Sequence, residues 1–544
     1  MRTLAVFGLC IGSAILQAQV KADACAPPPS GTAPSLPAQL LPGQGNVHFA
    51  ITTSNPEAQR FFDQGVNQMH SFWAVEAERS FLQAAQLDPE APMPWWGVAM
   101  VAAGDYRPRF QIDTGNKVFG PNRDPRVVAK RAIEAAEKAE RLAQVAGKAT
   151  DIEKLYIASI NGRRNPARGI DPDDAYIAGL QAIVKAHPNE VEAKTYLALH
   201  TMRGFTLPNH EPRPGTMDAV KLLRELMVEA PDHPGVHHYV IHGFEGSTFA
   251  KDAWHSCERY AELVPNIPHA LHMPGHIYSQ TGRWADAAKS FSDAAENELG
   301  WIKADKLYGR GHHGHNVHYL ATSLAFSGQY DKAIKQAKHL LTFTENPREA
   351  QQIDGFFNVY RQGWFAMLRA LVQGERWDQI LEGKTLPAYG KPREQIWTHW
   401  ARGLAFAAKG DAKSAAAEAK LMDAAMKEFN DKVKRAPSEE LQTARIELDA
   451  HVAAAQGRTK RALTLFDKAM TKERAMVYSE PPYYPRPVAI PLAQFAAKRS
   501  MRDRAVKAYQ AALEQFPAYA KAEEGLQQLH GGAVATSAAA AGGN

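Results

Sequence analysis

The sequence predicts an all-α chain that forms a superhelical solenoid of helix hairpins, and two observations support this fold class. Marker residues recur at a fixed interval, because Ala253 and Ala287 are 34 residues apart, as are Pro231 and Pro265. A repeat of this length indicates stacked hairpins that bury a continuous core between neighbours. The 544 residues, 45% of them hydrophobic, are also too many for one compact core.

The stretch from residue 282 to residue 294 shows what one hairpin contains. Gly282 suits a turn, Trp284 is a large packing residue, and Ala287 and Phe291 are spaced to face a partner helix. Small and large residues in this order, repeated every 34 residues, are typical of the tetratricopeptide repeat. We therefore expect a tetratricopeptide-repeat solenoid over residues 45–530, with histidine-rich central repeats at 190–345.

Helical periodicity and breaker residues place the individual units in order. Asp171 before Pro172 is a typical helix start, with an N-cap side chain followed by proline in the first turn. A proline-rich stretch at 208–214, which carries His210, interrupts the series. The expected units are a first repeat at 61–89, a hairpin opening at 94–97, helices near 125–146, 150–161, 172–186 and 190–202, hairpin units around 219–231, 253–265, 287–294 and 328–340, weaker units near 356–374, 396–429 and 441–470, and a last unit at 493–517.

Both ends of the chain differ in composition from the repeats. An apolar run over residues 4–16 and small residues at 22–24 indicate a secretory signal peptide at 1–24, and so a periplasmic or secreted protein. Residues 25–44 are rich in Pro, Gly, Ser and Ala and are expected to be a disordered leader, and residues 531–544 a disordered tail. No later apolar run is long enough to span a bilayer.

Cysteine content and charge exclude several classes of protein. Once the signal peptide is removed, only Cys25 and Cys257 remain of the three cysteines, so no disulfide framework is expected. Cys25 follows the predicted cleavage point, but Ala22 and Asp23 match a lipoprotein leader poorly, and we expect no lipid anchor. The formal net charge of +5 is small and scattered, which does not favour a nucleic-acid partner.

Histidines cluster in the central repeats, where fourteen of the 21 lie between His200 and His318. Aligning the three central hairpins on their alanine markers puts Ile241, Gly275 and Ala321 in one column of the first helix. Three residues before this column stand His238, His272 and His318, and one residue after it stand His242, His276 and Thr322. His269 and His315 stand six residues before it, and Glu245 stands four residues after it in the first hairpin. We expect the seven histidines and Glu245 to face one another in the concave groove of the solenoid.

Convergent imidazoles indicate a metal site, because neutral imidazole binds copper, zinc and iron alike. Pairs at i and i+4, such as His272 and His276, suit the two ligands of one ion. Glu245 is expected to be a further ligand or the base acting on a metal-bound water, and a catalytic use of the site stays open. The expected ligands of one or two transition-metal ions are His238, His242, Glu245, His269, His272, His276, His315 and His318.

Two features leave alternatives open. The same groove suits a metal-independent scaffold of the cell envelope that binds a peptide or a protein, with histidines as hydrogen-bond donors; His255, His312, His313 and His339 are expected to be ordinary hydrogen-bonded residues in any case. Pro274 either kinks its helix, because it removes the bond to the carbonyl of Ala270, or marks the start of that helix.

The chain resembles a widespread family of bacterial exported tetratricopeptide-repeat proteins. The similar segments are residues 61–97, residues 238–245, His272-Met-Pro-Gly-His276-Ile-Tyr, His315-Asn-Val-His318-Tyr-Leu and Glu480-Pro-Pro-Tyr-Tyr-Pro. The resemblance covers most of the chain and implies the solenoid and export, but no particular biochemistry. Through its motif, Glu480 becomes an additional candidate for the metal site.

Overall fold

The computed structural model describes residues 37–104, 125–206, 209–304, 310–343, 358–476, 479 and 481–541. Within these residues the chain is a succession of helices without a strand, and an isolated bridge joins Phe205 to Pro212. The predicted all-α solenoid of tetratricopeptide-type hairpins is therefore confirmed.

The helices fall into three consecutive groups. The first comprises α1 (Pro56–His70), α2 (Ala74–Leu87), α3 (Met93–Val101), α4 (Pro125–Ala143), α5 (Asp151–Arg164), α6 (Pro172–Ala186), α7 (Val191–Thr201) and α8 (Thr216–Glu229). The central group comprises α9 (Pro234–Phe244), η1 (Ala250–Ala253), α10 (Trp254–Leu263), α11 (Pro268–Gln280), α12 (Trp284–Ala304), α13 (Gly311–Phe326) and α14 (Tyr330–Leu340). The last comprises α16 (Val359–Gln373), α17 (Trp377–Leu381), α18 (Pro392–Ala408), α19 (Ala412–Val433), α20 (Glu439–Ala455), α21 (Thr459–Arg474), α22 (Ala489–Ala497), α23 (Arg502–Gln515) and α24 (Ala520–Ala541).

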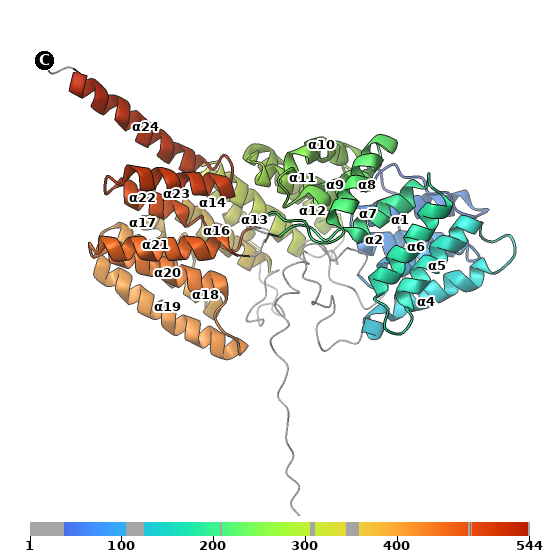
Figure 1. Ribbon diagram of the computed structural model, residues 1–544. Coiled ribbons are helices and arrows are strands. Elements are labelled where there is room, and N and C mark those ends of the chain that lie inside the picture. Colours follow the sequence, from blue (N-terminus) through green and yellow to red (C-terminus); the bar gives the residue numbers. More distant parts are fainter. Residues whose placement is uncertain are drawn as a thin grey trace, which may run out of the picture.

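Helices pack mainly on their neighbours in sequence, as α1 does on α2, α11 on α12 and α18 on α19. Figure 1 shows this order in space: α1 to α6 lie at one side of the molecule, α9 to α13 in the middle, and α16 to α23 at the other side. A contact of α1 with α9 departs from nearest-neighbour stacking and joins the N-terminal hairpin to the central group.

The predicted signal peptide and residues 25–36 of the predicted leader lie outside the described residues. The end of that leader is packed, not disordered, because its backbone is hydrogen-bonded to the solenoid. The carbonyl of Gln39 accepts from Gln64 (2.9 Å), and the carbonyl of Gly43 accepts from the backbone N–H of Asn266 (3.0 Å). At the other end α24 continues through residues 531–541, where we expected a loose tail, because this alanine-rich stretch has high helix propensity.

Pro274 lies inside α11, which runs from Pro268 to Gln280. Of the two expected arrangements, the continuous helix is the one observed. Proline has no backbone N–H, so the carbonyl of Ala270 lacks its usual helical partner. His272 and His276 nevertheless stay one helical turn apart on one face of α11.

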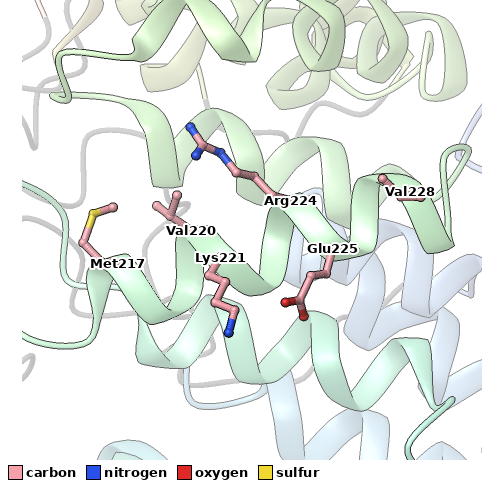
Figure 2. A pocket seen from close by; sticks show the side chains of 6 residues that line it. All are labelled: Met217, Val220, Lys221, Arg224, Glu225 and Val228. Atoms are coloured by element: carbon pink, nitrogen blue, oxygen red, sulfur yellow. The ribbon is translucent and has the colours of Figure 1, made fainter.

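The last helix of the first group, α8, carries two exposed large apolar side chains. Figure 2 shows that Met217, Val220, Lys221, Arg224, Glu225 and Val228 of this helix line a shallow hollow. The side chains of Val228 and Met217 are 84% and 45% exposed. No helix within the described residues is both long enough and apolar enough to cross a membrane.

Close helix crossings depend on glycines that face aromatic rings. In the first hairpin, a Cβ on Gly65 of α1 would lie 2.6 Å from the ring of Phe81 on α2, closer than atoms can approach. Phe81 is fully buried and has no room to move away. By contrast, a Cβ on Gly162 of α5 would meet nothing within 4 Å.

We expect Gly65→Ala to lower the thermal melting midpoint, with a cost of about 1–3 kcal/mol from overpacking against Phe81. Gly162→Ala is the matched control and should raise the midpoint slightly, because alanine favours a helix by up to about 1 kcal/mol over glycine. Circular dichroism melts of the two variants test this. Equal midpoints for both would contradict the close packing of α1 on α2.

Candidate metal centre

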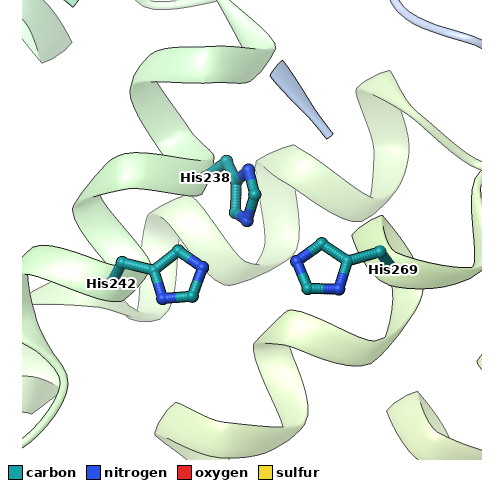
Figure 3. A group of neighbouring side chains, drawn as sticks. All are labelled: His238, His242 and His269. Carbon is teal, nitrogen blue, oxygen red and sulfur yellow. The ribbon is translucent and has the colours of Figure 1, made fainter. Parts of the chain in front are cut away.

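Three of the predicted ligands come together between α9 and α11. Figure 3 shows His238 and His242, which project from α9, facing His269 of α11. One ligand atom from each of the three side chains lies within 4.8 Å of those of the other two. The three residues, hereafter the α9–α11 triad, are 0%, 3% and 5% exposed. Imidazole nitrogens sit about 2.0–2.1 Å from a bound zinc ion, so two ligands of one ion lie at most about 4.2 Å apart, and the three rings would move slightly closer together to share one.

Local sequence explains how α9 and α11 present these side chains. α9 begins with His233 as N-cap and Pro234 in its first turn, and the four-residue interval puts His238 and His242 on one face. α11 begins at Pro268, so His269 lies in its first turn, where it faces α9.

Aromatic rings surround the triad and keep it dry. The ring of Phe72 lies 4.4 Å from that of His238 and 5.6 Å from that of His269, between centroids. Tyr260 stacks on the other side of His238 at 4.9 Å. Phe72 has a φ of +54°, a left-handed conformation that costs a non-glycine residue about 1–2 kcal/mol, so tertiary packing must hold it there.

A hydrogen bond sets the tautomer of His238. Its Nδ1 lies within hydrogen-bonding distance of the backbone carbonyl of His70, at the end of α1. A carbonyl only accepts, so Nδ1 must carry the proton, and the lone pair of the neutral ring is on Nε2. Metal-binding histidines are commonly oriented in this way by a carbonyl or a carboxylate.

A second triad of ligand-type residues, His70, Glu192 and His233, also has its ligand atoms within 4.8 Å of one another. The ring nitrogens of its two histidines, however, are already engaged in hydrogen bonds. The Nδ1 of His233 accepts from the backbone N–H of Val236 (3.2 Å), so the proton must be on Nε2, which donates to Glu192 (2.7 Å). The Nε2 of His70 lies 2.8 Å from the other carboxylate oxygen.

These protons occupy the positions that an ion would need, so we interpret His70, Glu192 and His233 as a hydrogen-bonded brace. The brace joins the end of α1 to α7 and to the start of α9. It thereby holds the His70 carbonyl against His238. Burial lowers the pKa of His70, which keeps its ring neutral in the brace.

The other predicted ligands lie beside the triad or apart from it. Glu245, the C-cap of α9, has one oxygen 3.7 Å from Nδ1 of His242 and the other 3.5 Å from Nδ1 of His276. It therefore lies between the triad and the next group of histidines. The Nε2 atoms of His272 and His276 are 2.5 Å apart, and the ring centroid of His315 is 5.0 Å from that of His272.

His318 does not join either group, although it shares a sequence column with His238 and His272. Its Nδ1 lies 2.5 Å from the side-chain oxygen of Gln362 on α16, to which it donates. Glu480 lies outside the described residues. Burial, followed by the neighbouring imidazoles, lowers the pKa of His272 and of His315 well below the ordinary value, so both rings are neutral at pH 7.

Sequence reasoning missed His70, Phe72, Glu192 and His233. All but His233 belong to the first group of helices, more than 35 residues from the triad in sequence, and none lies in a histidine column. The contact of α1 with α9 brings them to the site, and no repeat pattern encodes that contact.

The fold and the histidines define an all-helical repeat scaffold with a buried imidazole cluster. No protein-family model matches the chain, and no curated protein matches it significantly. Among solved structures it is similar to yeast Tom70 (13% identity, 89% of this chain and 97% of that chain covered, TM-score 0.33), to human IFIT1 in a dimer with m7Gppp-AAAA (13%, 90% and 92%, 0.32), and to a chain of the APC/C hetero-tetramer Cut9–Hcn1 (11%, 87% and 76%, 0.27). At these identities and TM-scores the likeness carries no inference about what the chain binds.

The buried histidines predict how stability depends on pH. Burial, followed by the charge of Arg369, lowers the pKa of His318 to about 3, and burial, followed by His339, lowers that of His313 to about 4. Both titrate near 6.5 when the chain is unfolded, so below that pH the unfolded state binds more protons. The free energy of unfolding then decreases by about 1.4 kcal/mol per pH unit for each residue.

We therefore expect the melting midpoint in chelator to fall as the pH is lowered from 7.5 to 5.0. His318→Gln should make that dependence shallower, whereas the same change at the exposed His255 should leave it as it is. A midpoint that stays constant over this range would show that the buried rings are not neutral.

Proposed function

We propose that this chain is a helical-repeat scaffold that holds a transition-metal ion between α9 and α11, with His238, His242 and His269 as ligands. The observation that supports this most directly is the convergence of three buried imidazoles from two helices. Three histidine ligands leave a fourth position for water or for a group from a partner, as in metal sites that keep an open coordination position. The ligand set fits copper, zinc or iron.

The tautomer of His238 adds independent support. Its Nδ1 proton is committed to the His70 carbonyl, which makes Nε2 the nitrogen with a lone pair. The proposal gives Glu245 a supporting role behind the ring of His242, since its oxygen lies 3.7 Å from Nδ1. At this distance the carboxylate is a charged neighbour of the ring, since a hydrogen bond would need about 3.2 Å or less.

The proposed location of the protein rests on the sequence alone. The secretory signal expected at residues 1–24 supports a periplasmic or secreted scaffold.

A second candidate function is a metal-independent scaffold that binds a peptide or protein in the cell envelope. The solenoid itself supports it, because stacked hairpins present long surfaces to partners. The exposed apolar side chains of Met217 and Val228 on α8 also favour a docking role (Figure 2). The two candidates differ in what the histidine cluster is for, and metal dependence distinguishes them.

The experiment compares two double variants of protein purified without a histidine tag. His238→Gln with His242→Gln removes two ligands of the triad, and His255→Gln with His339→Gln removes two exposed histidines as a matched control. After chelator treatment, each protein is dialysed against zinc, and its metal content and melting midpoint are measured. Zinc is the probe because it has no redox chemistry.

We expect the control to keep the metal content of the unaltered protein and the triad variant to lose one equivalent. Zinc should raise the melting midpoint of the unaltered protein, because an ion that binds only the folded state stabilises it by about 2.7 kcal/mol at 100 times its Kd. Equal zinc content in all three proteins would rule out the triad as a metal site. A partner captured equally well in excess chelator would then favour the metal-independent scaffold.

A further inference from the structure

The α9–α11 triad has a counterpart one hairpin further along the chain. His272 and His276 follow His238 and His242 by 34 residues each, and His315 follows His269 by the 46 residues of the longer hairpin. The first two lie on α11 and the third on α13, so the arrangement between α9 and α11 recurs between α11 and α13. We call His272, His276, His312 and His315 the α11–α13 cluster.

Two pairs of rings in the cluster are as closely spaced as their counterparts in the triad. In the triad, the ring of His238 lies 4.8 Å from that of His242 and 5.1 Å from that of His269, between centroids. In the cluster, the ring of His272 lies 4.5 Å from that of His276 and 5.0 Å from that of His315.

The Nε2 atoms of His272 and His276 also point at each other, 2.5 Å apart. One of the two neutral rings donates this hydrogen bond to the other. Imidazole nitrogens about 2.0–2.1 Å from one tetrahedral ion lie about 3.3 Å apart, so an ion would replace the shared proton and separate the two rings slightly. His272, His276 and His315 are all buried, at 0%, 1% and 0% exposed.

The cluster has a fourth ring that the triad lacks. His312, on the first turn of α13, has its centroid 5.4 Å from that of His272 and 6.0 Å from that of His315. Its Nδ1 lies 3.1 Å from a carboxylate oxygen of Glu298, a fully buried residue of α12 that also accepts from Asn316 (3.0 Å).

The Glu298 carboxylate fixes the tautomer of His312. A carboxylate only accepts, and the Nδ2 of Asn316, 3.3 Å from the same ring nitrogen, already donates to Glu298. We therefore assign the proton of His312 to Nδ1 and the lone pair to Nε2. That Nε2 is buried and has no hydrogen-bond partner within the described part of the chain. The oxygen of Glu245 lies 3.5 Å from the Nδ1 of His276, beside another ring of the cluster.

The third hairpin has no equivalent set of histidines. Thr322 occupies the position of His242 and His276, and His318, in the column of His238 and His272, is bound to Gln362. A third site would therefore lack one imidazole and have another turned away.

We propose that His272, His276, His312 and His315 form a second metal site, with four imidazole ligands, for a transition-metal ion such as Zn²⁺ or Cu²⁺. Glu298 orients His312 and makes it a stronger ligand. The site extends the proposed function to a second ion, but none of its four ligands belongs to the triad, so either site can fail without the other.

The test counts zinc ions in tag-free, chelator-treated protein by titration against a coloured zinc chelator. His312→Gln with His315→Gln is compared with His238→Gln with His242→Gln and with the control His255→Gln and His339→Gln. We expect two tightly bound ions in the unaltered protein and the control, and one in each of the other variants. Circular dichroism confirms that each variant is folded.

Other outcomes separate the two proposals. A single ion that only the His238 and His242 variant loses would overturn the second site and keep the first, and the reverse result would keep the second site alone. A single ion that both variants lose would mean one shared centre and would overturn the second site.

Glu298→Gln tests the role of the buried carboxylate without removing a ligand. It replaces the His312 and His315 variant as the test of the second site if that variant does not fold. Glutamine keeps the size and an acceptor oxygen but removes the charge. Loss of a carboxylate partner of this kind typically weakens binding about 10–100-fold, and we expect that loss for one ion only. Unchanged affinity for both ions would overturn the assignment of His312 as a ligand.

Discussion

Packing of neutral imidazoles in a dry interior is the constraint on which the middle of this solenoid depends. A charged ring buried among other rings and aromatic side chains would be costly, so burial lowers the pKa of His272 and of His315 well below the ordinary value. A neutral imidazole still has one N–H and one lone pair, and both need a partner in the core. The helices around α9, α11 and α13 supply such partners as carbonyls, carboxylates and, in our proposal, metal ions.

Two groups of histidines that look alike by distance therefore differ in chemistry. In the brace, the backbone N–H of Val236 forces the proton of His233 onto Nε2, and the network is complete with Glu192. In the triad, the carbonyl of His70 forces the proton of His238 onto Nδ1. The partner on the far side of the ring thus decides whether a histidine holds a neighbouring carboxylate or presents a lone pair.

The brace also explains why the N-terminal hairpin matters to a site that lies more than 160 residues further along the chain. Its residue His70 contributes a side chain to the brace and a carbonyl to His238. A Cβ at Gly235 would lie against the ring of His70, so α9 can pass this close only with glycine there. The first hairpin and the centre of the solenoid are consequently one structural unit.

The sequence by itself determined the repeat: the 34-residue interval, the small residues at close crossings and the histidine columns specify the helices and which side chains share a face. Only the tertiary structure decided how those columns divide. His318 is hydrogen-bonded to Gln362, and Glu245 lies between two groups of rings. His312, which belongs to no column, is hydrogen-bonded to Glu298 beside the second group. Periodicity fixes the direction of a side chain on its own helix. Which atom it meets depends on helices that are distant in sequence, and the contact of α1 with α9 has no signal in the repeat.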